Sequence, residues 1–295
     1  MSITIPPQQA LRESATFACR LCGHPVTPQA WGGGECNDCD STSMPVPPSA
    51  AEIAAFYARY NQNYTGGGAS AGRNLERYAK RYLQIVRRWR TGGRLIDIGS
   101  SNNPFPSRAA AAGFDTTMMD FVKPPSLAAS VRFIEGHMND EHALAAGAGV
   151  FDVVTSWAVM EHVPDPPRSA RVLAGLCKPG GLIVVSTPEA GTTLTRYAIG
   201  HSPWFYPPEH LNLISPNAFK SMFSPLGCTL RHWGRLELSW PRYAARYGVG
   251  LAGASVGAVA KALAPVWWRA QREARTQRFQ GVTYFVFEKA PAGSA

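Results

Sequence analysis

The sequence predicts an α/β fold in which a parallel sheet is covered by helices on both faces. Short apolar runs typical of buried strands alternate with helical patterns between residues 75 and 186. The first apolar run, residues 94–98, leads into a Gly/Ser/Asn cluster that suits a tight turn before a helix. The chain has 295 residues, 45% of them hydrophobic and 17% charged, so it can bury the core of one large domain with a small appendage.

An amphipathic helix is expected over residues 75–90, where Tyr78, Tyr82 and Ile85 fall at helical spacing. The sheet region is then expected to contain a strand at 94–98, a helix at 107–112, strands at 114–119, 131–134 and 151–156, a helix at 169–177, a turn at 178–181 and a strand at 182–186. Two later segments, 228–238 and 283–288, can pair as antiparallel strands that close the sheet.

Ligands of such sheets bind beyond the carboxyl ends of the strands. Gly99, Asp120, Met138 and Trp157 are all expected at those ends. The small residues of the 99–103 loop let the backbone approach an adenosine-type ligand, and the first N–H groups of the next helix face its polar end. The sequence therefore predicts a ligand site at this edge.

Two Cys-x2-Cys pairs near the N-terminus predict a zinc ribbon. They are Cys19 with Cys22 and Cys36 with Cys39, and the intervening glycines suit the chain reversals that a ribbon needs. Each pair can place two thiolates on one side of a tight turn, and two such turns form the tetrahedral sulfur site that zinc prefers. A four-thiolate site is closed to substrate, so its expected role is structural. The Ser/Pro-rich residues 41–49 are expected to be a linker.

The formal net charge of +9 suits an anionic partner such as nucleic acid, a phosphorylated substrate or a membrane surface, or else a solvated basic surface. The basic residues form no run of five, which favours the solvated surface. Residues 1–11 lack the pattern of a secretory signal, so a cytoplasmic location is expected. Residues 248–268 are almost uncharged, but Lys261 and Pro265 favour a packed helical element over a membrane span.

Several landmarks together resemble the class I S-adenosylmethionine-dependent methyltransferases. The loop after residue 98 is similar to the glycine-rich first loop of that family, with Ser101 and Asn103 in place of two glycines. An acid, Asp120, follows at the end of the second strand. Residues 151–163, which include a Glu-His pair, resemble the fourth strand and its loop, and residues 176–188 resemble the entry to the fifth strand.

This resemblance covers roughly residues 75–240 and implies a seven-stranded, mostly parallel Rossmann-like sheet whose last strand is antiparallel. It also implies three units along the chain. These are a zinc ribbon and linker at 1–48, N-terminal helices that cover the cofactor pocket at 49–92, and a methyltransferase domain at 93–295 with a helical insertion at 239–280.

The resemblance further implies which residues bind S-adenosylmethionine. His137 departs from the family, in which many members carry an acid that meets the adenine amino group. Asn103 is expected in a turn whose backbone faces the methionine end of the cofactor. The implied cofactor-binding residues are Asp97, Gly99, Ser101, Asn103, Asp120, Phe121, His137, Met138 and Trp157.

Methyl transfer needs a base or a polar clamp near the ends of the fourth and fifth strands. Glu161 and His162 form one candidate pair, because histidine titrates in the useful range. Helix capping and packing are the alternative role for this pair. His210 is the other candidate, because residues 206–210 resemble a segment that faces the acceptor in many small-molecule methyltransferases. It could instead stabilise its own loop.

The leading functional hypothesis is a methyltransferase for a small-molecule acceptor, namely a sugar, a glycan precursor or a secondary metabolite, with O-methylation expected. An apolar insertion with basic flanks would also suit a lipid-linked or membrane-proximal acceptor. A ribosomal-RNA base methyltransferase that recognises RNA through its zinc ribbon is the second hypothesis. The third is a zinc-ribbon binding module with an inactive methyltransferase-like domain. The sequence does not predict the oligomeric state.

Overall fold

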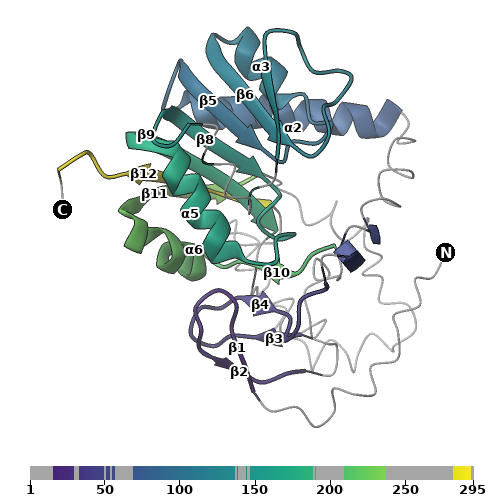
Figure 1. Ribbon diagram of the computed structural model, residues 1–295, viewed down its shortest axis with the longest axis vertical. Coiled ribbons are helices and arrows are strands. Elements are labelled where there is room, and N and C mark those ends of the chain that lie inside the picture. The colour runs from purple at the N-terminus through teal and green to yellow at the C-terminus, as the bar shows by residue number, and fades with distance from the viewer. Residues whose placement is uncertain are drawn as a thin grey trace, which may run out of the picture.

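The computed structural model describes residues 16–29, 33–49, 51–53, 55–56, 69–136, 138, 144, 147–188, 190, 209–236 and 282–293. A large α/β unit and a small N-terminal ribbon make up these parts, and Figure 1 shows the ribbon below the sheet, next to β10. The insertion expected at residues 239–280 lies outside the described residues, as does most of the segment 49–68.

The central sheet has seven strands in the order β11-β12-β9-β8-β5-β6-β7. The strands are β5 (Gly93–Ile98), β6 (Phe114–Asp120), β7 (Arg132–Glu135), β8 (Phe151–Trp157), β9 (Cys177–Pro188), β11 (Cys228–Arg235) and β12 (Val282–Lys289). Neighbouring strands from β9 to β7 are parallel, and β12 is antiparallel to both β9 and β11. The predicted sheet, including its antiparallel closure, is confirmed. The chain order reverses between β5 and β8, where such sheets bind their ligands.

Helices cover both faces of the sheet, because alternate strand residues point to opposite sides. Leu95 of β5 packs with the helices α2 (Ala69–Arg87) and α3 (Phe105–Ala111). Ile96, the next residue, packs in a second core with α5 (Pro166–Leu176) and α6 (Pro216–Phe223). A short 3-10 helix, η3 (Ser224–Leu226), follows α6. The carboxyl ends of the strands are left for the loops that form the site.

The segment expected as a turn at residues 178–181 is instead part of β9, which begins at Cys177. The turn prediction was wrong because β9 already begins at Cys177, which pairs with Phe151 of β8. The pairing resumes at Val153 with Leu182, so residues 178–181 form an irregularity within β9. Gly180 adopts a left-handed φ of 72° within this stretch, which glycine allows without steric cost.

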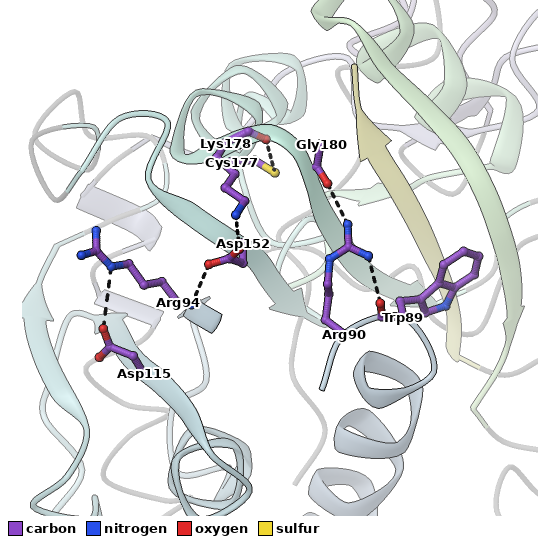
Figure 2. A network of polar contacts seen from close by, with 8 residues as sticks. All are labelled: Trp89, Arg90, Arg94, Asp115, Asp152, Cys177, Lys178 and Gly180. Carbon is purple, nitrogen blue, oxygen red and sulfur yellow. Dashed lines mark hydrogen bonds and ion pairs between the residues drawn. The ribbon is translucent and has the colours of Figure 1, made fainter. Parts of the chain in front are cut away.

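A polar network holds the amino ends of β5, β8 and β9 (Figure 2). The Asp152 carboxylate accepts the Arg94 backbone N–H at 2.8 Å and forms an ion pair with Lys178. Arg90, three residues after the end of α2, donates to the Gly180 carbonyl at 2.8 Å. These contacts lie at the edge opposite the ligand loops, so Lys178 has a structural role in this arrangement.

The ribbon is built from two small sheets. β1 (Phe17–Ala18) pairs with β2 (Pro25–Val26), and β3 (Gly34–Glu35) pairs with β4 (Thr42–Ser43). β4 also pairs with β10 (Asn212–Leu213), which precedes α6 in the large unit. The first residues of the expected linker, 41–43, are therefore buried, and Thr42 and Ser43 form a strand. The Ser/Pro composition concealed this strand, because its partner lies far away in the sequence.

Among the described parts of the chain, no helix is long and apolar enough to span a membrane. The uncharged segment 248–268 lies outside those parts.

Candidate active site

The loop after β5 forms a compact turn. Gly99 and Ser101 both adopt left-handed backbone conformations, with φ of 82° and 50°. The Asn103 N–H donates to the Ser100 carbonyl at 2.9 Å, and the Asn103 side-chain oxygen accepts the Phe105 N–H at 3.0 Å where α3 begins. Asn103 therefore lies in a turn at the carboxyl end of β5, as predicted, and outside the helix.

Asp97 lies beneath this loop and is fully buried. Its carboxylate accepts hydrogen bonds from the Ser100 and Thr155 hydroxyls. Burial raises its pKa to about 8, against the opposing effect of the Thr155 hydrogen bond. Asp97 thus ties β5, its loop and β8 together, and its direct contact with a cofactor stays a prediction.

Asp120 ends β6 beside the same loop. One of its carboxylate oxygens accepts the Ser101 N–H at 2.7 Å, and the other accepts the Phe121 N–H at 2.7 Å. The Phe121 side chain is 57% exposed. Met138 is buried and follows β7, while His137 lies outside the described residues. Asp120, Phe121 and Met138 thus follow the carboxyl ends of β6 and β7, at the edge that the sequence predicts.

Trp157 ends β8 and is almost fully buried. Its ring stacks on Tyr82 of α2 at 4.0 Å between centroids and meets the edge of Phe105 at 5.6 Å. The Trp157 indole N–H has no hydrogen-bond partner within the described residues. The stack attaches α2 to the carboxyl edge of the sheet, so helix α2 borders the site.

The residues at this edge suit an adenosyl ligand. A carboxylate at the end of the second strand accepts hydroxyl donors such as those of a ribose, and the exposed Phe121 ring offers an apolar face to a base. Gly99 and Ser101, which form the left-handed turn, are small residues and leave room for the ligand to approach the backbone. The chemistry of these groups therefore fits S-adenosylmethionine.

The loop after β8 packs directly on the loop after β5. A β-carbon added to Gly99 would lie 2.6 Å from a Val159 methyl group, closer than such atoms approach. Ala158 has a left-handed φ of 55°, and its N–H donates to the Ser186 carbonyl at 3.1 Å. This strained turn directs the next residues, Glu161 and His162, into the interior beside the expected cofactor loop.

Glu161, His162 and His210 form one cluster. One ligand atom from each residue, a ring nitrogen or a carboxylate oxygen, lies within 4.8 Å of those of the other two. The two imidazole rings meet edge to face with centroids 4.6 Å apart. The Glu161 carbonyl accepts the N–H groups of Leu211 and Asn212 at 2.8 and 3.1 Å, which brings His210 to the cluster. The structure therefore joins the two candidate catalytic segments that the sequence kept apart.

Burial controls the charge of this cluster. The Glu161 side chain is 1% exposed, and burial raises its pKa to about 8, against smaller opposing effects of its own N–H and of the nearby Thr187 hydroxyl. Burial, with the neighbouring His210, lowers the pKa of His162 to about 3. His162 Nδ1 lies 2.8 Å from the Glu209 carbonyl. A carbonyl only accepts, so Nδ1 carries the proton in this contact and Nε2 faces Glu161 at 3.9 Å.

The four ribbon cysteines form a second cluster, with all four sulfur atoms within 4.8 Å of one another. The distances are 3.7 Å between the sulfurs of Cys19 and Cys39 and 3.5 Å between those of Cys22 and Cys36. Tetrahedral zinc holds its sulfur ligands about 3.8 Å apart, since each Zn–S bond is about 2.3 Å long. The geometry therefore fits a zinc ion and excludes disulfides, whose sulfurs are about 2.05 Å apart.

Each cysteine pair ends in a turn with a left-handed residue. Gly23 and Asp40 follow the two pairs with φ of 82° and 56°, and their N–H groups donate to the carbonyls of Cys19 and Cys36. The glycine after the first pair was part of the sequence prediction. Asp40 was not, although aspartate tolerates this conformation better than most residues.

Sequence reasoning missed the residues that dock the ribbon beside the site. The Ser215 hydroxyl donates to the Cys39 carbonyl, and the Ser41 hydroxyl accepts the Ser215 N–H at 3.0 Å. The Arg20 guanidinium donates to the Pro164 carbonyl, just beyond the Glu-His loop. Arg20 is a variable position between Cys19 and Cys22, and Ser41 and Ser215 belong to no motif, so only the fold reveals these contacts.

The seven-stranded sheet and the loops at its switch point define the class I S-adenosylmethionine-dependent methyltransferases. A model of the family described as "Methyltransferase domain" matches residues 71–232. The chain belongs to this family.

Two curated relatives are named ubiquinone biosynthesis O-methyltransferase. The protein from a Caulobacter species is 37% identical over 103 residues, which cover 32% of this chain and 41% of the relative. The Aromatoleum aromaticum protein is 34% identical over 103 residues, which cover 32% of this chain and 44% of the relative. The chain thus spans less than half the length of these relatives.

Among solved structures, the chain is similar to the 1,6-didemethyltoxoflavin-N1-methyltransferase of Burkholderia thailandensis, whose structure contains 1,6-didemethyltoxoflavin and S-adenosylhomocysteine. The TM-score is 0.52 and the sequence identity 15%, over 87% of this chain and 98% of that chain. At this identity the likeness concerns the fold alone.

Proposed function

We propose that this protein transfers a methyl group from S-adenosylmethionine to a hydroxyl oxygen of a small organic acceptor, such as a sugar, a glycan precursor or a secondary metabolite. The observation that carries the proposal is the cluster of buried Glu161 and His210 with partly buried His162, on the loop whose Val159 packs against Gly99. The names of the two curated relatives, which are O-methyltransferases, support the same reaction type.

Bound S-adenosylmethionine would supply a methyl group on a positively charged sulfur. The chain then has to place the acceptor oxygen in line with that methyl group and receive the hydroxyl proton. Glu161, with a pKa of about 8, suits proton transfer near neutral pH. His162, with a pKa of about 3, is too weak a base and instead orients the cluster through its contact with Glu209.

We propose that the cofactor lies across the carboxyl ends of β5, β6 and β8. Asp120 would accept the ribose hydroxyls, Phe121 would face the adenine, and the turn from Gly99 to Asn103 would hold the methionine end. Met138 would line the adenine side and His137 would contribute there, while Asp97 and Trp157 would support the pocket from below.

The acceptor class is tested by incubating the protein with S-adenosylmethionine labelled in its methyl group and a fractionated host extract. We expect the label in small polar products as a methyl ether. Transfer into RNA would contradict the proposal and support a ribosomal-RNA enzyme, and transfer into lipid would favour a lipid-linked acceptor. Glu161→Gln should reduce transfer by about 100-fold or more, whereas His232→Ala, a histidine on β11 away from the cluster, should not.

We also propose that the four ribbon cysteines hold a structural zinc ion. The zinc would fix β4, and with it the β10 segment whose backbone N–H groups bind the Glu161 carbonyl. Cys36→Ser should lose this zinc and lower both the melting temperature and methyl transfer. Cys228→Ala, which alters a buried cysteine outside the cluster, should keep the zinc. Full zinc content in Cys36→Ser would argue against the site.

A further inference from the structure

The cluster of Glu161, His162 and His210 has the composition of a metal site. Two imidazoles and one carboxylate are the protein ligands of several catalytic zinc and iron centres, in which the remaining positions stay open to water or substrate. Glu161 and His162 come from the loop after β8, and His210 comes from the segment before β10. The fold therefore brings together ligands that are nearly fifty residues apart in sequence.

A second observation points to a ligand in the same place. Both carboxylate oxygens of Glu161 are buried, and neither has a hydrogen-bond partner within the described residues. The Thr187 hydroxyl is near enough to Glu161 to lower the pKa of its carboxyl, but it makes no complete hydrogen bond in that part of the chain, and neither does the Asn212 side-chain oxygen. Burying a carboxylate without compensation is costly, and a bound cation would remove that cost.

The contacts outside the cluster orient the ligands as in known metal sites. Histidine ligands commonly donate their second ring N–H to a backbone carbonyl, which directs the other nitrogen to the metal. His162 makes this contact through Nδ1 to the Glu209 carbonyl at 2.8 Å, and its Nε2 faces the Glu161 carboxylate. Glu161 is held in turn through its own carbonyl by the N–H groups of Leu211 and Asn212.

The distances allow a metal ion after a small contraction. His162 Nε2 and Glu161 Oε1 are 3.9 Å apart, and the largest separation between ligand atoms in the cluster is below 4.8 Å. A tetrahedral zinc-like ion holds nitrogen and oxygen ligands about 3.4 Å apart. To bind such an ion, the His162–Glu161 separation has to shorten by about 0.5 Å, and no separation in the cluster by more than about 1.4 Å.

We infer that Glu161, His162 and His210 bind a divalent transition-metal ion of the zinc type, with open positions for the acceptor oxygen. The two imidazoles favour such an ion over magnesium, which prefers oxygen ligands. This inference deepens the proposed function, on which it rests. With the ion bound, Glu161 is a ligand rather than a base, and the ion would hold the acceptor hydroxyl and lower its pKa, so that the hydroxyl loses its proton to water. The acceptor oxygen would then take the methyl group as the sulfur–methyl bond of S-adenosylmethionine breaks, and S-adenosylhomocysteine would leave. The site is separate from the four-cysteine cluster and differs from it in having open positions.

The test measures metal binding by the full chain, without methyl transfer. The purified protein is treated with chelator and titrated with Co²⁺ while its visible absorption is recorded. Cobalt in the ribbon gives thiolate charge-transfer bands, whereas cobalt in the Glu-His-His site gives only the weaker bands of nitrogen and oxygen ligands. We expect one further equivalent of cobalt beyond the thiolate-bound one.

The variants Glu161→Gln and His210→Gln should weaken binding of this further equivalent by at least about tenfold, the smaller effect known for perturbed metal sites. They should keep the thiolate bands, which show that the ribbon is folded, and His232→Ala should bind cobalt like the unaltered protein. Binding of cobalt to the thiolates alone, or an unchanged further equivalent in both cluster variants, would overturn the inference.

The cobalt titration and the methyl-labelling experiment can fail independently, so failure of the metal site is distinguishable from failure of the proposed function. Cobalt bound at the cluster of a protein that labels only RNA would keep the metal site and refute the small-molecule acceptor. Methyl ether formation by a protein that binds cobalt only at its thiolates would refute the metal site and keep the proposed reaction.

Discussion

Replacement of Asp97 by asparagine should remove a pH dependence of stability that the buried carboxyl creates. In the folded protein the pKa of Asp97 is about 8, mainly because of burial, compared with an ordinary value of 3.8. Between these values the folded state keeps a proton that the unfolded chain has lost. The free energy of unfolding therefore falls as pH rises through this window, and the contribution is complete only below about pH 4.

The magnitude follows from the size of the shift. One proton of difference corresponds to about 1.4 kcal/mol per pH unit. Between pH 5 and pH 8, Asp97 therefore lowers the free energy of unfolding by up to roughly 4 kcal/mol. The asparagine side chain cannot titrate, so the stability of Asp97→Asn relative to the unaltered protein should rise by this amount over the same interval.

Urea unfolding, followed by tryptophan fluorescence at pH 5, 6, 7 and 8, measures this difference. Comparison of the two proteins at each pH cancels other titrating groups, such as His162, whose lowered pKa has the opposite effect on the pH profile. Asp115→Asn is the matched control, because that carboxylate lies on the same sheet but its side chain is 78% exposed. A stability difference between Asp97→Asn and the unaltered protein that is equal at pH 5 and pH 8 would refute the reasoning.

Three further predictions concern the loops and the ribbon. Gly99→Ala should destabilise the fold by at least about 1–2 kcal/mol, because the φ of 82° at Gly99 disfavours alanine and the new methyl group would meet Val159. An unchanged free energy of unfolding in urea would contradict this prediction. Asp120→Asn should weaken S-adenosylmethionine binding by about 10- to 100-fold, the effect of losing charge-assisted hydrogen bonds, and calorimetry would reveal an unchanged affinity if the carboxylate does not bind the cofactor. Ser215→Ala should lower the free energy of unfolding by about 1–2 kcal/mol, because Ser215 caps α6 and also contacts Cys39. A loss in urea unfolding below the ~1 kcal/mol that is typical of a helix cap alone would show that the contact with Cys39 contributes nothing to stability.

The amino-acid pattern was sufficient for the elements that local chemistry governs. Strand and helix periodicity located the parallel strands, and the antiparallel pair at the end of the sheet was also predicted. Aspartate at the end of β6 and the turn at Asn103 follow from short segments whose backbone needs are visible in their residues. Errors arose where pairing is long-range. Residues 178–181, expected as a turn, are part of β9, in which β8 pairs with Cys177 and then with Leu182 but with none of the residues between them.

In the ribbon, too, the sequence predicted the local features but not the long-range ones. Spacing alone identified Cys19, Cys22, Cys36 and Cys39 as one cluster, because each pair is local and the chemistry of four thiolates is specific. The docking of this ribbon was not predictable. β4 lies in a Ser/Pro-rich segment with no strand pattern, and it is a strand because β10, far along the chain, offers its backbone groups.

For the candidate site, the sequence by itself determined the identities of Glu161, His162 and His210 and the loops that carry them. It presented them as two unrelated candidates, because their separation along the chain contains no information about distance. Only the tertiary structure decided that they form one buried cluster, through the N–H groups of Leu211 and Asn212 on the Glu161 carbonyl. Burial, which sets the pKa values and leaves the Glu161 carboxylate without a hydrogen-bond partner among the described residues, depends on every layer packed around it and therefore on the whole fold.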